Sequence, residues 1–294
     1  MIRTVPVVGL LLLLLVTLAG CTVSGSVIEK EDERQSFQVG DSPRVIVETF
    51  NGRIGVTVAG DGAVEARVVR RGSGTSSAAA KRDLDNVEVR FSQVGDTIRI
   101  EARRDDLDQT IGNSGADVEV TVPASSSVEL RTANGRVESA NVEGSVLVRT
   151  SNGTITTRGG RNLDLDTTNG DISANAPSGR VIARSSNGGI DILAAKEAVV
   201  TATTSNAPIS FSGTLGPGAH TFETTNDDID LTLPGDAAFQ LDGTTNNGSV
   251  RTDYQGLKLT DTSLSGHTGD DPTPLIAIGA HTSNGDLAVM TQKP

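Results

Sequence analysis

The sequence predicts an all-β protein that folds as a parallel β-solenoid, with short coils stacked along one axis. A phrase of the form T-x-N-G-x-I recurs, and from residue 134 to residue 247 its Asn returns every 17 to 21 residues. A fixed period of this size is typical of repeat proteins. Apolar and polar residues alternate on both sides of each Asn, as in short strands that have one buried face. When the copies are aligned on the Asn, the apolar positions form inward columns and the polar positions form outward columns, and the third residue after the Asn belongs to an inward column. Each unit of about 18 residues is therefore expected to hold two strands with a corner between them. The marker residues are Asn134, Asn152, Asn169, Asn187, Asn206, Asn226, Asn247 and Asn284.

Two arrangements of these units remain open. Asn-Gly between alternating strands is a strong hairpin signal, so a meander of β-hairpins is one of them. In the other, each unit is one solenoid coil, and the Asn side chains form a ladder of hydrogen bonds from coil to coil. Asn persists where Gly is lost, at Asn206-Ala207 and Asn226-Asp227, which favours the ladder. A Thr or Ser two residues before each Asn also favours it, because stacked hydroxyls can pair with one another.

The first twenty residues have the features of an export signal. Arg3 precedes an apolar run from Val5 to Val16 that is too short for a comfortable membrane span. The segment Leu18-Ala19-Gly20-Cys21 resembles the lipobox of bacterial lipoproteins. That resemblance implies a lipid on the Cys21 sulfur and cleavage of the chain just before Cys21. Cys21 is the only cysteine, so no internal disulfide is expected.

The rest of the chain predicts one elongated β domain over residues 37–294. Residues 21–36 are charged and lack an apolar period, which predicts a flexible tether. Residues 37–125 predict an irregular β region with a hairpin around 93–96 and either a short helix or a loop at 81–85. Regular coils are expected over 126–294. The 37 residues between Asn247 and Asn284 would then hold two coils, one of them degenerate.

The charge balance disfavours two classes of partner. Lys and Arg number 25 against 37 Asp and Glu, which gives a net charge of −12. Such a surface repels nucleic acid and anionic lipid. Contact with a membrane is therefore expected only through the lipid on Cys21.

Acidic residues recur beside the corners and on the outward columns. Stacked carboxylates could bind Ca²⁺ or act as a glycosidase pair. A solvated acidic face is expected instead, because the carboxylates do not recur in one column over three successive coils. These residues are Asp171, Asp191, Asp228, Asp230 and Asp286.

The three histidines do not predict a metal site. His220 falls in an inward column and is expected to be a core residue. His267 and His281 lack a third ligand at a sensible spacing. The sequence predicts no catalytic residue, no metal and no cofactor.

From about Val45 to Met290 the chain resembles a bacterial putative-adhesin domain family of unknown function. The segments Thr168–Ile172 and Ser283–Leu287 carry the resemblance best. It implies a right-handed β-solenoid in a cell-envelope setting, with no catalytic residues to transfer. The departures at Asn206-Ala207-Pro208 and Asn226-Asp227-Asp228 predict less regular later coils.

Two functions are consistent with these features. The first is a non-enzymatic, exported lipoprotein, anchored to the cell membrane or envelope, that acts in adhesion, scaffolding or envelope sensing. Its partner would be an envelope protein or a polysaccharide. The alternative is an extracytoplasmic polysaccharide-active enzyme of the β-helix kind. Charged side chains that converge on one groove beneath a long loop would favour the enzyme.

Overall fold

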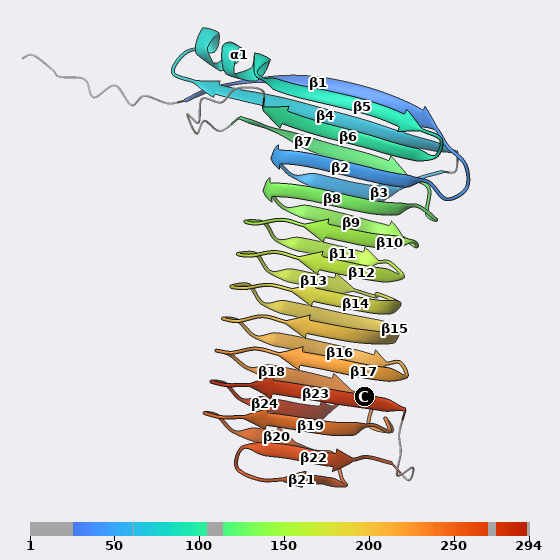
Figure 1. The fold of residues 1–294 in the computed structure, drawn as a ribbon, viewed down its shortest axis with the longest axis vertical. Coiled ribbons are helices and arrows are strands. Elements are labelled where there is room, and N and C mark those ends of the chain that lie inside the picture. Colours follow the sequence, from blue (N-terminus) through green and yellow to red (C-terminus); the bar gives the residue numbers. More distant parts are fainter. Residues whose placement is uncertain (1–25, 61, 105–113, 270–274, 293–294) are drawn as a thin grey trace, which may run out of the picture.

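The computed structural model describes residues 26–60, 62–104, 114–269 and 275–292, and these form an elongated all-β molecule (Figure 1). Its strands make one nearly closed, solenoid-like sheet with two facing stacks. In the repeated coils, neighbouring units pair in parallel and in register, for example Ile155 with Ile172 and Ile172 with Ile190. Parallel pairing excludes the meander of hairpins, because consecutive hairpin strands would be antiparallel. The prediction of an all-β, solenoid-like fold is confirmed.

Each coil contributes its first strand to one stack and its second strand to the other, with the Asn corner between them. The β2 stack contains, in spatial order, β5 (Val87–Val94), β6 (Thr97–Arg104), β2 (Arg44–Asn51), β8 (Ser127–Asn134), β10 (Ser145–Arg149), β12 (Asn162–Asp166), β14 (Gly179–Arg184), the second half of β15 (Ile190–Thr203), β17 (Gly218–Glu223), β23 (Ile276–Thr282), β19 (Gln240–Thr245), β22 (Ser263–His267) and β21 (Leu257–Leu259). The β3 stack contains β1 (Val27–Gln38), β4 (Ala63–Gly74), β7 (Gly115–Val122), β3 (Ile54–Val58), β9 (Val137–Val142), β11 (Ile155–Gly159), β13 (Ile172–Asn175), the first half of β15, β16 (Ile209–Leu215), β18 (Ile229–Leu233), β24 (Leu287–Thr291) and β20 (Val250–Thr252).

The core lies between the two stacks and consists of the predicted inward columns. The residue three positions after each Asn is buried, and this column is confirmed. The later coils add aromatic contacts, with the rings of Phe211 and Phe222 5.6 Å apart and those of Phe239 and Tyr254 5.1 Å apart. The buried column contains Ile54, Val137, Ile155, Ile172, Ile190, Ile209, Ile229, Leu287 and Val250.

The coils do not stack in the order of the sequence at either end. The coil β23–β24 lies between β17–β18 and β19–β20, although it follows both in the chain. Likewise, β2–β3 lies between β6–β7 and β8–β9. The predicted degenerate coil between Asn247 and Asn284 is wrong, because β21 and β22 pair antiparallel and extend the β2 stack beyond β19.

The flexible tether predicted over 21–36 is wrong from Val27 onward, because Val27–Gln38 forms β1. This strand pairs antiparallel with β4 along its whole length. Its acidic side chains meet arginines of β4: Arg70 binds Glu31 and Glu33 at 2.7 Å each, and Arg67 binds Asp32 at 2.6 Å. Charges that indicate a solvated segment are thus paired with a distant strand.

We call β1, β4, β5 and the helix that packs on them the N-terminal cap of the molecule (Figure 1). This helix was one of the two expected alternatives. It is α1 (Ser77–Asp85), it begins earlier than expected, and it packs against β4. The side chain of Ser76 caps it by accepting a hydrogen bond from the amide of Ala79 at 3.3 Å. The predicted hairpin is confirmed as β5–β6, with Gly95 in its turn at φ 57°. Within the described ranges, no helix is long and apolar enough to cross a membrane.

Candidate functional site

The eight marker asparagines form one continuous ladder on the outside of the corner. Apart from Asn134 at one end, which only accepts, each side-chain amide donates to the side-chain carbonyl oxygen of the Asn on the neighbouring coil, at 2.6–2.9 Å. The order follows the spatial stacking of the coils, so Asn284 donates to Asn226, and Asn247 donates to Asn284. These side chains are exposed, and the ladder therefore links the coils in contact with solvent.

The Thr and Ser column beside the ladder is buried and does not pair with itself. Thr167 donates to the carbonyl oxygen of Gly153 at 3.1 Å, and Ser185 donates to that of Gly170 at 3.0 Å. The prediction that stacked hydroxyls pair with one another is wrong. At the corner the backbone carbonyls have left the strand ladder, and a buried carbonyl needs a donor.

Close packing rather than turn conformation favours Gly at this position of the phrase. A Cβ at Gly170 would lie 1.9 Å from the carbonyl oxygen of Gly153, and one at Gly188 would lie 1.9 Å from that of Gly170. None of these glycines has the positive φ that a two-residue hairpin turn demands. Ala207 and Asp227 occupy this position in two later coils, and their carbonyls still accept from Thr224 and Thr282.

The Asp after the Gly forms a further link between coils. Asp171 accepts a hydrogen bond from the amide of Gly189 at 2.9 Å, and Asp228 accepts one from the amide of Asp286 at 2.7 Å. Asp286 accepts in turn from Ser249 at 2.9 Å, which lowers the pKa of the Asp286 carboxyl. The acidic column thus has a structural role in these coils.

Asn169→Asp is expected to lower the free energy of unfolding by about 1–2 kcal/mol at neutral pH. Asn169 donates to Asn152 at 2.6 Å and accepts from Asn187 at 2.7 Å. An ionised carboxylate can only accept, so it would repel the oxygen of Asn152. That repulsion raises the pKa of the introduced carboxyl in the folded state, so the deficit should shrink as acid protonates it.

Urea unfolding at pH 7 and at pH 4 measures this effect. Asn246→Asp is the matched control, because Asn246 is exposed beside the ladder and lies outside its chain of bonds. Equal behaviour of the two variants at both pH values would show that the ladder contributes nothing to stability.

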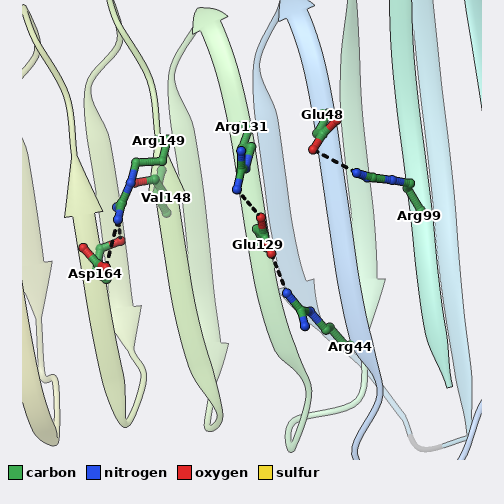
Figure 2. Close-up of polar contacts among 8 residues, drawn as sticks. All are labelled: Arg44, Glu48, Arg99, Glu129, Arg131, Val148, Arg149 and Asp164. Atoms are coloured by element: carbon green, nitrogen blue, oxygen red, sulfur yellow. Dashed lines mark hydrogen bonds and ion pairs between the residues drawn. The ribbon is translucent and has the colours of Figure 1, made fainter.

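A row of ion pairs crosses the outward face of the β2 stack over the first coils (Figure 2). The carboxylate of Glu129 on β8 forms ion pairs with Arg44 of β2 at 2.7 Å and with Arg131 of its own strand at 2.6 Å. The bond from Arg44 holds the pKa of Glu129 below its usual value.

Two more pairs extend this row along the stack. Arg99 of β6 lies 3.2 Å from Glu48 of β2, and Arg149 of β10 lies 2.8 Å from Asp164 of β12 (Figure 2). The guanidinium of Arg149 also donates to the backbone carbonyl of Asp164 at 3.1 Å. The strand pairing thus fixes a pattern of charges on a flat surface.

A shallow hollow of about 460 Å³ lies next to this charged face, near the Asn corner. It extends over β6, β2, β8 and β10. The half-buried ring of Phe50 contributes apolar surface, and Glu101, Arg103, Arg131 and Arg149 supply charges. Such a surface can dock a polar partner through several weak contacts.

The sequence of the later coils matches a known family. Residues 161–290 match the family model described as Toastrack DUF4097. This stretch is similar to the Toastrack family. The resemblance to an adhesin-like family of unknown function is confirmed over these residues. The earlier coils repeat the same corner, since Thr132 donates to the carbonyl of Gly52 at 3.1 Å and Asn152 donates to Asn134.

Solved structures resemble the chain at low sequence identity. A putative adhesin from Bacteroides fragilis is 12% identical, with a TM-score of 0.42, over 89% of this chain and 97% of that one. A putative cell adhesion protein from Clostridium sporogenes is 9% identical, with a TM-score of 0.34, over 90% and 100%. A putative lipid binding protein from Parabacteroides distasonis is 11% identical, with a TM-score of 0.36, over 88% and 96%. Among curated proteins, no sequence matches.

Two of the three histidines, His220 and His281, are accounted for by local contacts. His220 is buried, accepts from the amide of Val200 at 3.2 Å and donates to the carbonyl of Gly216 at 2.9 Å. Burial lowers the pKa of His220, and this pair of bonds requires the neutral ring. His220 is thus the predicted core residue.

His267 and His281 are not brought together, because β22 and β23 pair with opposite sides of β19. His281 instead lies 2.9 Å from the hydroxyl of Thr244. In the described part of the chain, no three His, Cys, Asp or Glu side chains are grouped to hold a metal ion.

The sequence pattern did not predict the charged face. The partners Arg44 and Glu129 are 85 residues apart, so no local pattern indicates their contact. Alternating charges within single strands, as in Glu129 and Arg131, were the only available signal. Cys21 lies outside the described residues, so its lipidation stays a prediction.

Proposed function

We propose that this protein is an exported, lipid-anchored and non-enzymatic envelope module that acts in adhesion or scaffolding. The observation that carries the proposal is the position of β1. It begins at Val27, six residues after Cys21, and is built into the cap by pairing with β4. Six residues extend to at most about 20 Å. A lipid on Cys21 would therefore hold the capped end of the molecule next to the membrane.

The other end of the molecule would then project away from the bilayer. β1 and β21–β22 lie at opposite ends of the long axis (Figure 1). Residues 197–294 contain 12 acidic and 3 basic residues, so most of the net negative charge lies toward that far end. An anionic membrane surface repels such a tip, which supports the same orientation.

A rigid stack of coils suits the display of a binding surface at a distance. Successive ladder contacts join residues 17 to 20 apart from Asn134 to Asn226, which supports coils of about 18 residues. The right-handed sense of these coils is part of the proposal and rests on the family resemblance. The charged face of the β2 stack and its hollow are the surface we assign to an envelope protein or polysaccharide.

Catalysis by the β-helix type of enzyme is less well supported by the geometry. Asp171, Asp228 and Asp286 accept backbone hydrogen bonds from neighbouring coils. Glu48, Glu129 and Asp164 are paired with arginines. Carboxylates committed in this way are poorly placed for acid–base work on a substrate.

Cys21→Ser is expected to release the protein from the membrane fraction, because the variant has no sulfur to carry the lipid. Fractionation of cells that express each form, with mass spectrometry of the N-terminus, measures this. Ser24→Ala is the matched control and should remain in the membrane fraction with a lipidated Cys21. Equal partitioning of the Cys21→Ser variant and the parent would contradict the anchor.

A further inference from the structure

Four cations gather at the second corner of the coils, on the opposite side from the Asn ladder. Arg158 is the next-to-last residue of β11, Arg161 lies between β11 and β12, Arg180 is the second residue of β14, and Lys196 lies at the corner within β15. All four are exposed, and among the described residues none of them pairs with a carboxylate. We call this group the basic corner. It contrasts with the charged face, whose arginines are bound to carboxylates.

A hollow of about 520 Å³ lies at the basic corner. Successive coils meet there through backbone bonds: the amide of Arg161 donates to the carbonyl of Gly144 at 3.0 Å, and that of Ser178 donates to Gly160 at 2.9 Å. The hollow therefore runs along the stack rather than into one coil. The residues that line it include Asn141, Glu143, Gly160, Arg161, Ser178 and Lys196.

The backbone at this hollow has an unusual conformation. Asn141 has φ 64° and Ala176 has φ 53°, and these are the two non-glycine residues with positive φ in the described part of the chain. Both line the hollow. Left-handed backbone in residues other than glycine is costly and concentrates at functional sites. Gly159 and Gly160 also have positive φ and leave this surface bare of side chains.

The chemistry of the hollow selects an anion. Arg161 and Lys196 outnumber the single carboxylate of Glu143, while Asn141 and Ser178 add hydrogen-bond donors. This local excess of positive charge stands against a net charge of −12 for the chain. Free guanidinium and ammonium groups bind carboxylates through charge-assisted hydrogen bonds.

We propose that the basic corner binds the carboxylate groups of a linear acidic polysaccharide. Strands of neighbouring coils lie about 4.8 Å apart, so the coils of Arg161 and Lys196, two steps apart, are separated by about 10 Å. An extended chain that carries carboxylates at regular intervals can reach both cations. Nucleic acid fits less well, since the overall charge repels it and no aromatic ring lines the hollow for base stacking.

Binding of the full chain in detergent to polygalacturonate, with neutral dextran as comparison, tests the proposal by calorimetry at low ionic strength. We expect binding to polygalacturonate alone, weakened by added salt. Arg161→Gln/Lys196→Gln should lower the affinity at least ten-fold, while Arg161→Lys/Lys196→Arg should retain it. Lys30→Gln/Lys258→Gln is the matched control, since it removes two exposed cations elsewhere and should leave the affinity unchanged.

Three outcomes would overturn the proposal: no binding to polygalacturonate, equal binding to dextran, or equal weakening by the two Gln pairs. Equal weakening would mean diffuse attraction rather than a site. Because the measurement uses purified protein and leaves Cys21 intact, its failure would not bear on membrane anchoring, and failure of the anchor would not bear on it.

Discussion

Ile172→Asp is expected to abolish cooperative unfolding or to lower the free energy of unfolding by about 4 kcal/mol or more. Ile172 is 1% exposed and packs in register between Ile155 and Ile190 of the adjacent coils. A carboxylate there has apolar neighbours above and below, and burial of an unpaired charge is among the most destabilising single changes. Urea unfolding followed by circular dichroism measures the loss.

Ser173→Asp is the matched control, because it introduces the same group one residue later on the outward column. Ser173 is half-buried and lies in register with Asp191, so repulsion between the two carboxylates should cost less than about 1 kcal/mol. Similar midpoints for the two variants would mean that the inward and outward columns are misassigned.

The columns could be predicted because each coil repeats the same local pattern. Val137, Ile155, Ile172 and Ile190 recur at one offset from the Asn, and one buried face per strand requires that recurrence. The persistence of Asn where Gly is lost indicated that the Asn serves neighbouring coils. In the structure these Asn side chains are joined from coil to coil by amide hydrogen bonds.

The order of the coils could not be predicted from the same pattern. The coils marked by Asn226, Asn247 and Asn284 carry the same repeated phrase, so their local sequences do not specify which of them are neighbours. Burial decides it, because β23 packs Ile278 and Ala280 between β17 and β19. The position of β1 could not be predicted for the same reason, because its acidic side chains pair with Arg67 and Arg70 of the distant strand β4.

The two charged surfaces were missed for a related reason. Arg44, Glu129 and Asp164 lie in outward columns that vary freely from coil to coil, so no period marks them. Their contacts depend on the register of strands distant in sequence. The cations of the basic corner lie in turns whose length varies from coil to coil, so the repeated phrase does not predict where they meet.

Removal of residues 276–294 is expected to unfold the far end of the molecule rather than only to shorten it. In an ordinary solenoid, loss of the last coil in sequence exposes one face of its neighbour. Here the lost strands β23 and β24 separate the coil β17–β18 from β19–β20, so the latter would lose its parallel partners in both stacks. The deletion also removes the buried side chains of Ile278, Leu287 and Val289, which contribute on the order of 5 kcal/mol together.

Limited proteolysis with mass spectrometry measures this effect. Residues 234–275 should become readily cleaved, while the coils up to Leu233 should keep their resistance. A chain that ends at Thr291 is the matched control, since it retains both strands and the contacts of Asn284 with Asn226 and Asn247. If residues 234–275 remain as resistant in the long deletion as in the control, then β19 can close directly onto β17. In that case the inserted coil would not be needed to hold the far end of the stack.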